Sequence, residues 1–170
     1  MVAKLRAHYD GWWQKVSPRV NEHGAITVGR KAENPLQLSP ADWDDSFLDQ
    51  GTQVRNGLRR NGYWNIYVAR AGNYEIELRR WPREEDVAMT APITPRADYD
   101  GEARPGVALP IANARLKLGD YDHTKPVTAA DKAVKFVTKL KAGPVKLETW
   151  FNDSAGKEIS GAYYVYVERK

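Results

Sequence analysis

The sequence predicts an all-β fold, an antiparallel and jelly-roll-like β-sandwich preceded by one N-terminal α-helix. Three observations support this prediction. Roughly eight short segments alternate apolar and polar residues, as half-buried strands do. Turn-forming residues separate these segments at regular spacing. Helical periodicity is confined to the first 20 residues, so the pattern is not that of strands alternating with helices in a parallel sheet.

The first predicted element is a helix over residues 4–20. Its apolar residues recur at helical spacing and share one stripe of the helix, which Ser17-Pro18 then ends or kinks. The stripe consists of Leu5, Tyr9, Trp12, Trp13 and Val16.

Two interpretations of this aromatic stripe are open. The helix packs its tryptophans against the domain's own sheet, or it is a connector whose Tyr9, Trp12 and Trp13 dock on another domain. Two adjacent tryptophans are costly to leave in water, so each interpretation gives them a partner. We assign residues 4–20 to a connector helix and residues 24–170 to the β-sandwich.

Short strands follow from residue 25 onward. Turn signals such as Gly119-Asp120 and Ala142-Gly143 separate them, and residues 90–110, with four of the ten prolines, are predicted to form a long loop. The order of an aromatic strand, an Ala-Gly-x-Tyr strand and a Lys-Ala-Gly-Pro strand favours a jelly roll of the kind found in carbohydrate-binding modules. The predicted strands are residues 25–28, 36–38, 54–58, 63–69, 74–81, 114–118, 133–140, 145–151 and 162–168.

The segment from Gly62 to Pro82 is the most informative part of the chain. Its two strand-like runs meet at a tight turn, Ala71-Gly72-Asn73, and are therefore predicted to form a β-hairpin. One face of each arm is apolar and faces the core, whereas the other face of the second arm is charged and aromatic. The apolar sets are Trp64, Ile66 and Val68 in the first arm and Tyr74, Ile76 and Leu78 in the second, and the outer set is Glu75, Glu77, Arg79 and Trp81.

A ligand site is predicted on this outer face, from Glu77, Arg79, Arg80 and Trp81, together with Trp150. Trp150 points outward on the strand 145–151 if its alternate residues point inward. An indole ring stacks on the apolar face of a sugar, and a guanidinium binds a carboxylate or sulfate through paired hydrogen bonds. The alternative interpretation is that these residues pair across strands, cover the sheet or face another domain.

The residues needed for catalysis or metal binding are not grouped in this sequence. There is no cysteine, no Gly-x-Ser-x-Gly motif and no glycine-rich phosphate loop. His8, His23 and His123 are scattered, without a partner at ligand spacing. Two acidic turns, residues 98–102 and 120–122, could hold calcium, but solvated turns of this kind are common. We therefore predict no catalytic residue, no metal and no cofactor.

The charge of the chain argues against nucleic acid as a partner. The formal net charge is +4, and the only dense basic run, Arg79-Arg80 with Arg83, is followed at once by Glu84-Glu85-Asp86. No segment is long and apolar enough to suggest a membrane span, and the first 13 residues lack the apolar core of a signal peptide.

The chain resembles the C-terminal region of bacterial arylsulfatases, of the kind expanded in marine planctomycetes. The matching residues are spread along nearly the whole chain, and the run at 71–82 is the most specific. They are HYDGWW (8–13), Val16, Pro18-Arg19, ITVG (26–29), NPLQLSPADW (34–43), Gln53, Gly62, Trp64, AGNYEIELRRWP (71–82), LPI (109–111), Ala114, KAGP (141–144) and GAYYVYVER (161–169).

The resemblance implies an accessory role. In that family an N-terminal α/β domain carries the catalytic formylglycine in a Cys/Ser-x-Pro-x-Arg motif, which this chain lacks. The chain is therefore expected to be a non-catalytic domain that docks on a sulfatase catalytic domain, with Tyr9, Trp12 and Trp13 at the junction, and helps hold a sulfated substrate. The parent protein would be periplasmic or secreted. The alternatives are an autonomous carbohydrate-binding module for glycans, sulfated or not, and a small enzyme with an unrecognised site.

Overall fold

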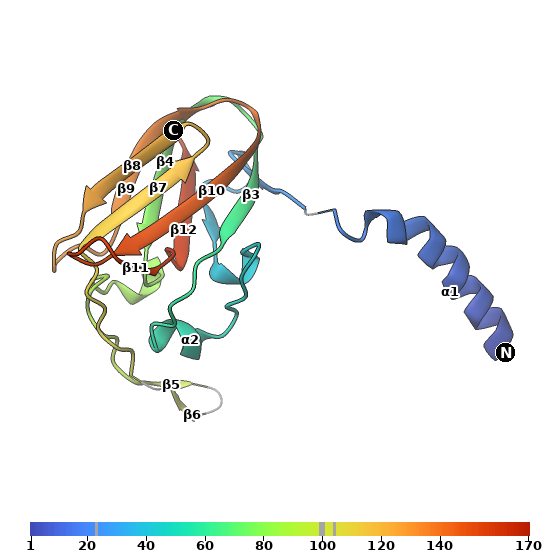
Figure 1. Ribbon diagram of the computed structural model, residues 1–170, viewed down its shortest axis with the longest axis horizontal. Helices are drawn as coiled ribbons and strands as arrows, with labels where there is room; N and C mark the ends of the chain where they lie inside the picture. Colours follow the sequence, from blue (N-terminus) through green and yellow to red (C-terminus); the bar gives the residue numbers. More distant parts are fainter. Residues whose placement is uncertain (23, 99–100, 104) are drawn as a thin grey trace.

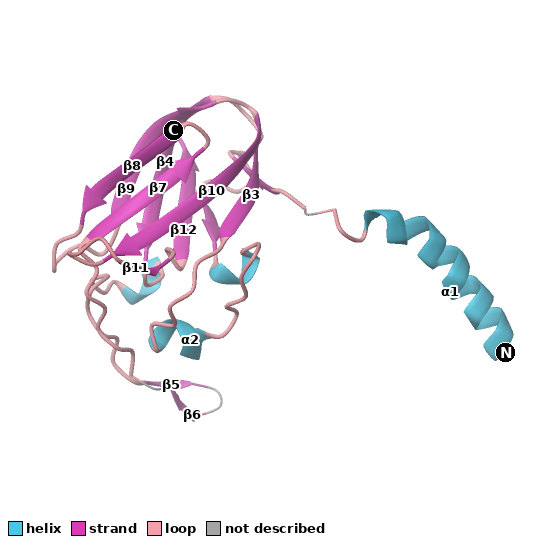
Figure 2. Ribbon diagram, viewed as in Figure 1, coloured by secondary structure: helices cyan, strands magenta, loops and turns pink. Residues whose placement is uncertain are grey.

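Two β-sheets packed face to face form the body of the protein in the computed structural model, which describes residues 1–22, 24–98, 101–103 and 105–170 (Figures 1 and 2). The first sheet has the order β1-β3-β10-β7-β8, with β11 also paired to β10, and the second has the order β2-β12-β4-β9. Nearly all neighbours are antiparallel, and the exception is β1 beside β3, which is parallel. The predicted all-β sandwich with an N-terminal helix is confirmed.

The strand bounds follow the chain order. They are β1 (Ile26–Val28), β2 (Leu36–Leu38), β3 (Tyr63–Val68), β4 (Gly72–Arg79), β5 (Arg96–Asp98), β6 (Gly101–Ala103), β7 (Asn113–Leu118), β8 (Tyr121–Pro126), β9 (Val134–Leu140), β10 (Gly143–Asn152), β11 (Glu158–Ser160) and β12 (Tyr164–Arg169). The helices are α1 (Val2–Val16) and α2 (Gly51–Arg55), and the short 3-10 turns are η1 (Ser17–Arg19), η2 (Pro40–Asp42) and η3 (Arg83–Glu85).

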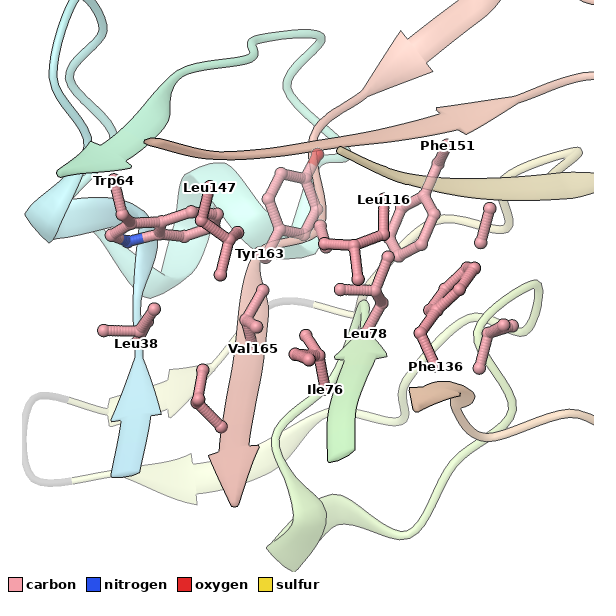
Figure 3. Close-up of a cluster of buried hydrophobic side chains, with 14 of the residues drawn as sticks. Leu38, Trp64, Ile76, Leu78, Leu116, Phe136, Leu147, Phe151, Tyr163 and Val165 are labelled. Atoms are coloured by element: carbon pink, nitrogen blue, oxygen red, sulfur yellow. The ribbon is translucent and has the colours of Figure 1, made fainter. Parts of the chain in front are cut away.

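The core lies between the two sheets and is filled from both. Strands such as β7 and β10 alternate buried and more exposed residues, so the inner face of each main sheet is apolar. Figure 3 shows the facing side chains in contact, with Trp64, Leu147 and Leu116 from the first sheet meeting Ile76 and Val165 from the second. Removing these side chains from water is the main favourable contribution to folding.

The predicted hairpin between residues 62 and 82 is wrong. Its two arms, β3 and β4, lie in different sheets: β3 pairs with β1 and β10, and β4 pairs with β12 and β9. The connection through Ala71 therefore crosses from one sheet to the other. Alternation shows that each arm has one buried face, but two apolar faces can share a sheet or face each other across the core. Here they face each other.

Two further segments differ from the prediction. Residues 54–58 are not a strand; the short helix α2 ends at Arg55, and Gln50 and Gln53 cap its start with reciprocal side-chain hydrogen bonds. Residues 121–126, for which no strand was predicted, form the edge strand β8, whose side chains are mostly exposed. Without a buried face this strand has no apolar alternation for the sequence to show.

Helix α1 extends away from the sandwich (Figure 1). None of its residues is buried, so the interpretation in which it packs against its own sheet is wrong. Tyr9, Trp12 and Trp13 contact one another instead, with ring centroids 5.7 to 6.3 Å apart. Their docking role stays a prediction. Of the helices formed by the described residues, none combines the length and hydropathy that crossing a membrane requires.

A buried arginine holds the long segment that follows β4. Arg80 is fully buried and donates hydrogen bonds to the carbonyl oxygens of Met89 at 3.4 Å, Ala91 at 3.3 Å and Val107 at 2.6 Å. Its guanidinium also lies over the Trp81 ring, 4.3 Å from the centroid. Burial lowers the pKa of Arg80 to about 10, which still leaves it protonated at neutral pH.

Replacing Arg80 with alanine should destabilise the domain strongly. Arg80→Ala removes the side-chain donor to the Met89 and Val107 carbonyls, leaves Ala91 with only the Trp81 indole, and opens a cavity, and we expect a loss of about 3 kcal/mol in the free energy of unfolding. Urea denaturation measures it. The control is Arg59→Ala, at an exposed arginine, which should change stability by less than about 0.5 kcal/mol. A similar small effect for both variants would contradict the assigned role of Arg80.

Two glycines with nearly the same backbone angle allow a matched test of close packing. Gly29 has φ +78°, and a Cβ there would lie 2.0 Å from the Tyr74 hydroxyl, whereas Gly156 has φ +80° and nothing within 4 Å. Gly156→Ala should cost only the backbone strain, about 1 kcal/mol. Gly29→Ala should cost about 3 kcal/mol, because Tyr74 must also move. Thermal or urea unfolding compares them, and equal losses would exclude the steric term.

Candidate functional site

The structure removes two residues from the predicted ligand patch. Arg80 is fully buried and Trp81 is 2% exposed, so neither can meet a ligand. The cause is the segment after β4: Ala91 accepts the Trp81 indole hydrogen bond at 3.2 Å, and Gly106 packs directly against the ring. Strand alternation placed Trp81 on an outer face, but β4 ends at Arg79, and the following segment covers the ring.

Glu77 and Arg79 are engaged in a closed ionic cluster. Glu77 is 3% exposed and accepts hydrogen bonds from Arg79 and, at 2.6 and 3.2 Å, from Arg83. The Arg83 guanidinium also lies 4.1 Å from the centre of the Tyr166 ring. These residues pair across the surface of the second sheet, which is the alternative interpretation given above. Their polar atoms are directed at one another.

Trp150 lies as predicted, on the outer face of β10. Its neighbours Leu147, Thr149 and Phe151 are fully buried, while Trp150 is partly exposed. It belongs to the first sheet, however, whereas Glu77 and Arg79 belong to the second. The five residues of the predicted patch are therefore not brought together.

A different set of side chains surrounds Trp150. In the β10–β7 ladder Arg115 lies directly opposite, and its guanidinium stacks on the indole 4.5 Å from the ring centroid. Asp122 on β8 holds Arg115 in place through two hydrogen bonds of 2.7 and 2.5 Å. The hydrogen bond with Arg115 lowers the pKa of Asp122, so this carboxylate stays charged. Asp122, one of the acidic residues considered for calcium, is thus an ion-pair partner.

On the other side of Trp150 the surface forms an open hollow of about 310 Å³. It lies where β10 changes partner: β3 pairs with β10 as far as Glu148, and β11 takes over at Phe151. We call this site the Trp150 hollow. Its lining residues are Asp45, Asn61, Gly62, Tyr63, Lys146, Glu148, Trp150 and Glu158.

Asn61 lines the hollow at the point where β10 is paired with neither β3 nor β11. Its side-chain NH₂ donates to the Thr149 carbonyl at 2.9 Å and to the Glu158 carboxylate at 3.1 Å. The Lys146 ammonium lies over the Tyr63 ring, 3.7 Å from its centre, and this contact helps fix the position of the ring. The hollow therefore presents two aromatic residues whose positions are fixed by their polar neighbours.

The charge of the hollow is negative. Three carboxylates, Asp45, Glu148 and Glu158, line it against one cation, Lys146, which also lies 3.2 Å from Glu148. Carboxylates accept hydrogen bonds from hydroxyl groups but repel anions. Among the described residues no group of three or more potential metal ligands comes together. The acidic turn at 98–102 and His23 fall wholly or partly outside the described residues.

The sequence identified Trp150 but not its neighbours. Tyr63 was assigned to the start of a strand, and Asn61 and Glu158 had no motif to mark them. Their place depends on the strands that pair with β10: the paired residues of β3 are about 80 positions away in the sequence, and those of β11 only a few. Register between distant strands leaves no local signal in the chain.

Comparison with known proteins gives distant likenesses to carbohydrate-active proteins. No protein-family model matches the chain, and no curated protein matches its sequence. Among solved structures, a ruminal GH26 endo-beta-1,4-mannanase matches with 13% identity and a TM-score of 0.43, over 80% of this chain and 26% of the mannanase. The chain thus spans about a quarter of that protein.

Two carbohydrate-binding modules of family CBM6 match over nearly their whole length. The C-terminal CBM6 of LamC from Zobellia galactanivorans shares 12% identity at a TM-score of 0.40, over 80% of this chain and 100% of the module. The CBM6cm-2 module of Cellvibrio mixtus lichenase 5A, solved in complex with cellotriose, shares 10% identity at a TM-score of 0.37. That match covers 81% of this chain and 98% of the module. Likenesses this distant carry no argument about a ligand. The resemblance to arylsulfatases stays a prediction.

The Glu77 cluster predicts a pH dependence of stability. Burial alone would raise the pKa of Glu77, but hydrogen bonds from Arg83 and Arg79 outweigh it and lower the pKa from 4.5 to about 2. A lowered carboxyl pKa stabilises the folded state above the unfolded pKa, and this stability is lost as the pH falls toward 2. We expect the loss to be roughly 2–3 kcal/mol between about pH 5 and pH 2.

The test of this prediction is urea unfolding of wild type and Glu77→Gln at pH 7, 5 and 3. Glu77→Gln should be the less stable protein at pH 7, and the difference should shrink as the pH falls. Glu33→Gln, at an exposed carboxylate, is the matched control and should follow wild type throughout. A constant difference between wild type and Glu77→Gln would show that Glu77 does not titrate in this range.

Proposed function

We propose that this protein is a non-catalytic saccharide-binding domain, and that a sugar binds in the Trp150 hollow. The observation that carries the proposal is the arrangement of Trp150 and Tyr63 beside three carboxylates and an amide in one open depression. Sugar sites combine an aromatic ring, which stacks on the C–H face of a pyranose, with polar groups that bind its hydroxyls. The Trp150 hollow supplies both kinds of group.

The position of the Trp150 ring is fixed before any ligand binds. Arg115 supports it from the β7 side, and Asp122 fixes Arg115, so the indole does not need to be ordered when a ligand arrives. The hollow adjoins the indole on its β3 side. A side chain that is already fixed loses little entropy on binding, which favours affinity.

The charge of the hollow selects among sugars. Glu148 and Glu158 are hydrogen-bond acceptors that suit the hydroxyls of a neutral saccharide, and with Asp45 they disfavour a sulfate group at the same place. Arg79 and Arg80, which were expected to bind sulfate, are committed to Glu77 and to backbone carbonyls. We therefore infer that the ligand group in this hollow is neutral.

One observation favours a second candidate, the accessory domain that docks on a sulfatase catalytic domain. The aromatic side chains of α1 are exposed, with Tyr9 at 54%, Trp12 at 50% and Trp13 at 42% of full exposure. A helix of 15 residues is only marginally stable by itself in water. A neighbouring domain that covered these rings would stabilise it. The two roles use separate surfaces and are compatible.

Removing the Trp150 ring should abolish most of the sugar affinity. The probe is an array of neutral gluco- and manno-oligosaccharides and their sulfated forms, followed by calorimetry on the tightest ligand. Trp150→Ala should weaken binding of the neutral sugar at least about tenfold, because a central tryptophan supplies a large share of binding energy.

The matched control is Trp12→Ala, which removes an exposed indole from α1 and should leave sugar affinity unchanged. Binding that survives Trp150→Ala would place the site elsewhere. Absence of binding across the array would favour docking through α1 as the role of the chain. Circular dichroism of each variant checks that the fold is retained.

A further inference from the structure

We propose that a second, basic pocket at the other end of β3 binds an oxyanion of the sulfate or phosphate kind. The pocket has a volume of about 170 Å³ and adjoins the end of the sandwich where β1 and β3 finish and β4 begins. It does not overlap the Trp150 hollow, which lies at the start of β3. Its lining residues are Gly29, Arg30, Lys31, Asn34, Arg70 and Arg169.

The fold holds this pocket in place from two sides. The buried Tyr74 donates its hydroxyl proton to the Arg70 carbonyl at 2.7 Å, and Gly29 approaches the same ring so closely that no Cβ fits. Asn34 makes two hydrogen bonds of 2.8 Å with the backbone of Arg169, one to its carbonyl and one from its amide. The turn after β1, the crossing after β3 and the end of β12 are thereby fixed against one another.

The charge of the pocket is entirely positive. Four cations line it, and no carboxylate does. Arg30, Lys31 and Arg70 make no side-chain hydrogen bond or ion pair with any residue in the described part of the chain. Glu33 belongs to the same turn as Arg30 but does not line the pocket. Like charges held this close repel one another, and an anion between them relieves that repulsion.

Arg169 supplies a donor that has no acceptor. Its Nε–H is shielded from solvent and unpaired in the described structure, while its NH₂ group makes only a long bond, 3.4 Å, to the Ala71 carbonyl. The guanidinium lies flat against Gly72. The Arg169 guanidinium therefore adds a positive charge to the pocket lining and attracts an anion through that charge.

The size and composition of the pocket identify the ligand class. Its volume is about 170 Å³, against about 310 Å³ for the Trp150 hollow, which suits a single oxyanion group rather than an oligosaccharide. No aromatic ring lines it, so it lacks the stacking surface that a sugar ring uses. Three guanidinium groups match the several oxygens of a sulfate or phosphate.

The test is a titration followed by amide chemical shifts, with four probes: inorganic sulfate, inorganic phosphate, a monosaccharide sulfate ester and its neutral parent sugar. The three anions should shift the amides of Gly29, Ala71 and Gly72, and the neutral sugar should not. Arg30→Ser/Arg70→Ser should weaken anion binding about tenfold. Arg59→Ser/Lys157→Ser removes the same charge at exposed positions outside the pocket and should change it less than about twofold.

Each outcome decides the proposal. Equal weakening of anion binding in both double variants would indicate general charge attraction and would overturn the proposal. Amide shifts spread over the whole surface, or no amide shifts at all, would also overturn it. Tighter binding of the sugar sulfate than of the free anions would identify a sulfated saccharide as the source of the oxyanion. Lys31→Ser provides the test if the double variant fails to fold. Trp150→Ala should leave anion binding intact. The anion-binding proposal and the sugar-binding proposal for the Trp150 hollow can therefore fail independently of each other.

Discussion

Much of this structure depends on one buried cation, the Arg80 guanidinium at the end of β4. The described residues between β4 and β7 add no strand to either main sheet, so their backbone must find partners elsewhere. Arg80 provides three of them through the carbonyls of Met89, Ala91 and Val107. A guanidinium suits this role because its donors are spread over a flat, rigid group that reaches several acceptors at once. With the segment fixed, the Trp81 ring is covered and cannot meet a ligand.

The strands of the sandwich are readable from the sequence where one face is buried. Residues 114–118, 133–140, 145–151 and 162–168 show clear alternation, and the structure has β7, β9, β10 and β12 there. Alternation states that a face is buried, but not against which partner. For this reason β3 and β4 were predicted as a hairpin although they lie in opposite sheets. Strand β8 escaped prediction because an exposed edge strand has no apolar face.

The candidate site was predictable only in its central residue. Trp150 faces outward because its neighbours along β10 face the core, a purely local relation. Tyr63 and Asn61 join it from about 85 residues away in the chain, and Glu158 joins it through the pairing of β11 with β10. Burial of Arg80 and Trp81 depends on a segment without regular structure. The basic pocket combines three separate turns. Properties that arise from such long-range packing have no counterpart in local sequence patterns.

The two ends of β3 carry opposite charge, and this has a consequence for how the protein meets a charged surface. Carboxylates predominate around the Trp150 hollow, whereas only cations line the pocket at the far end. The six residues of β3 separate them by about 20 Å, twice the distance over which ~0.1 M salt screens charge. The domain is thus an electric dipole along this strand. An anionic polymer or cell wall would attract the basic end first and leave the aromatic hollow facing outward.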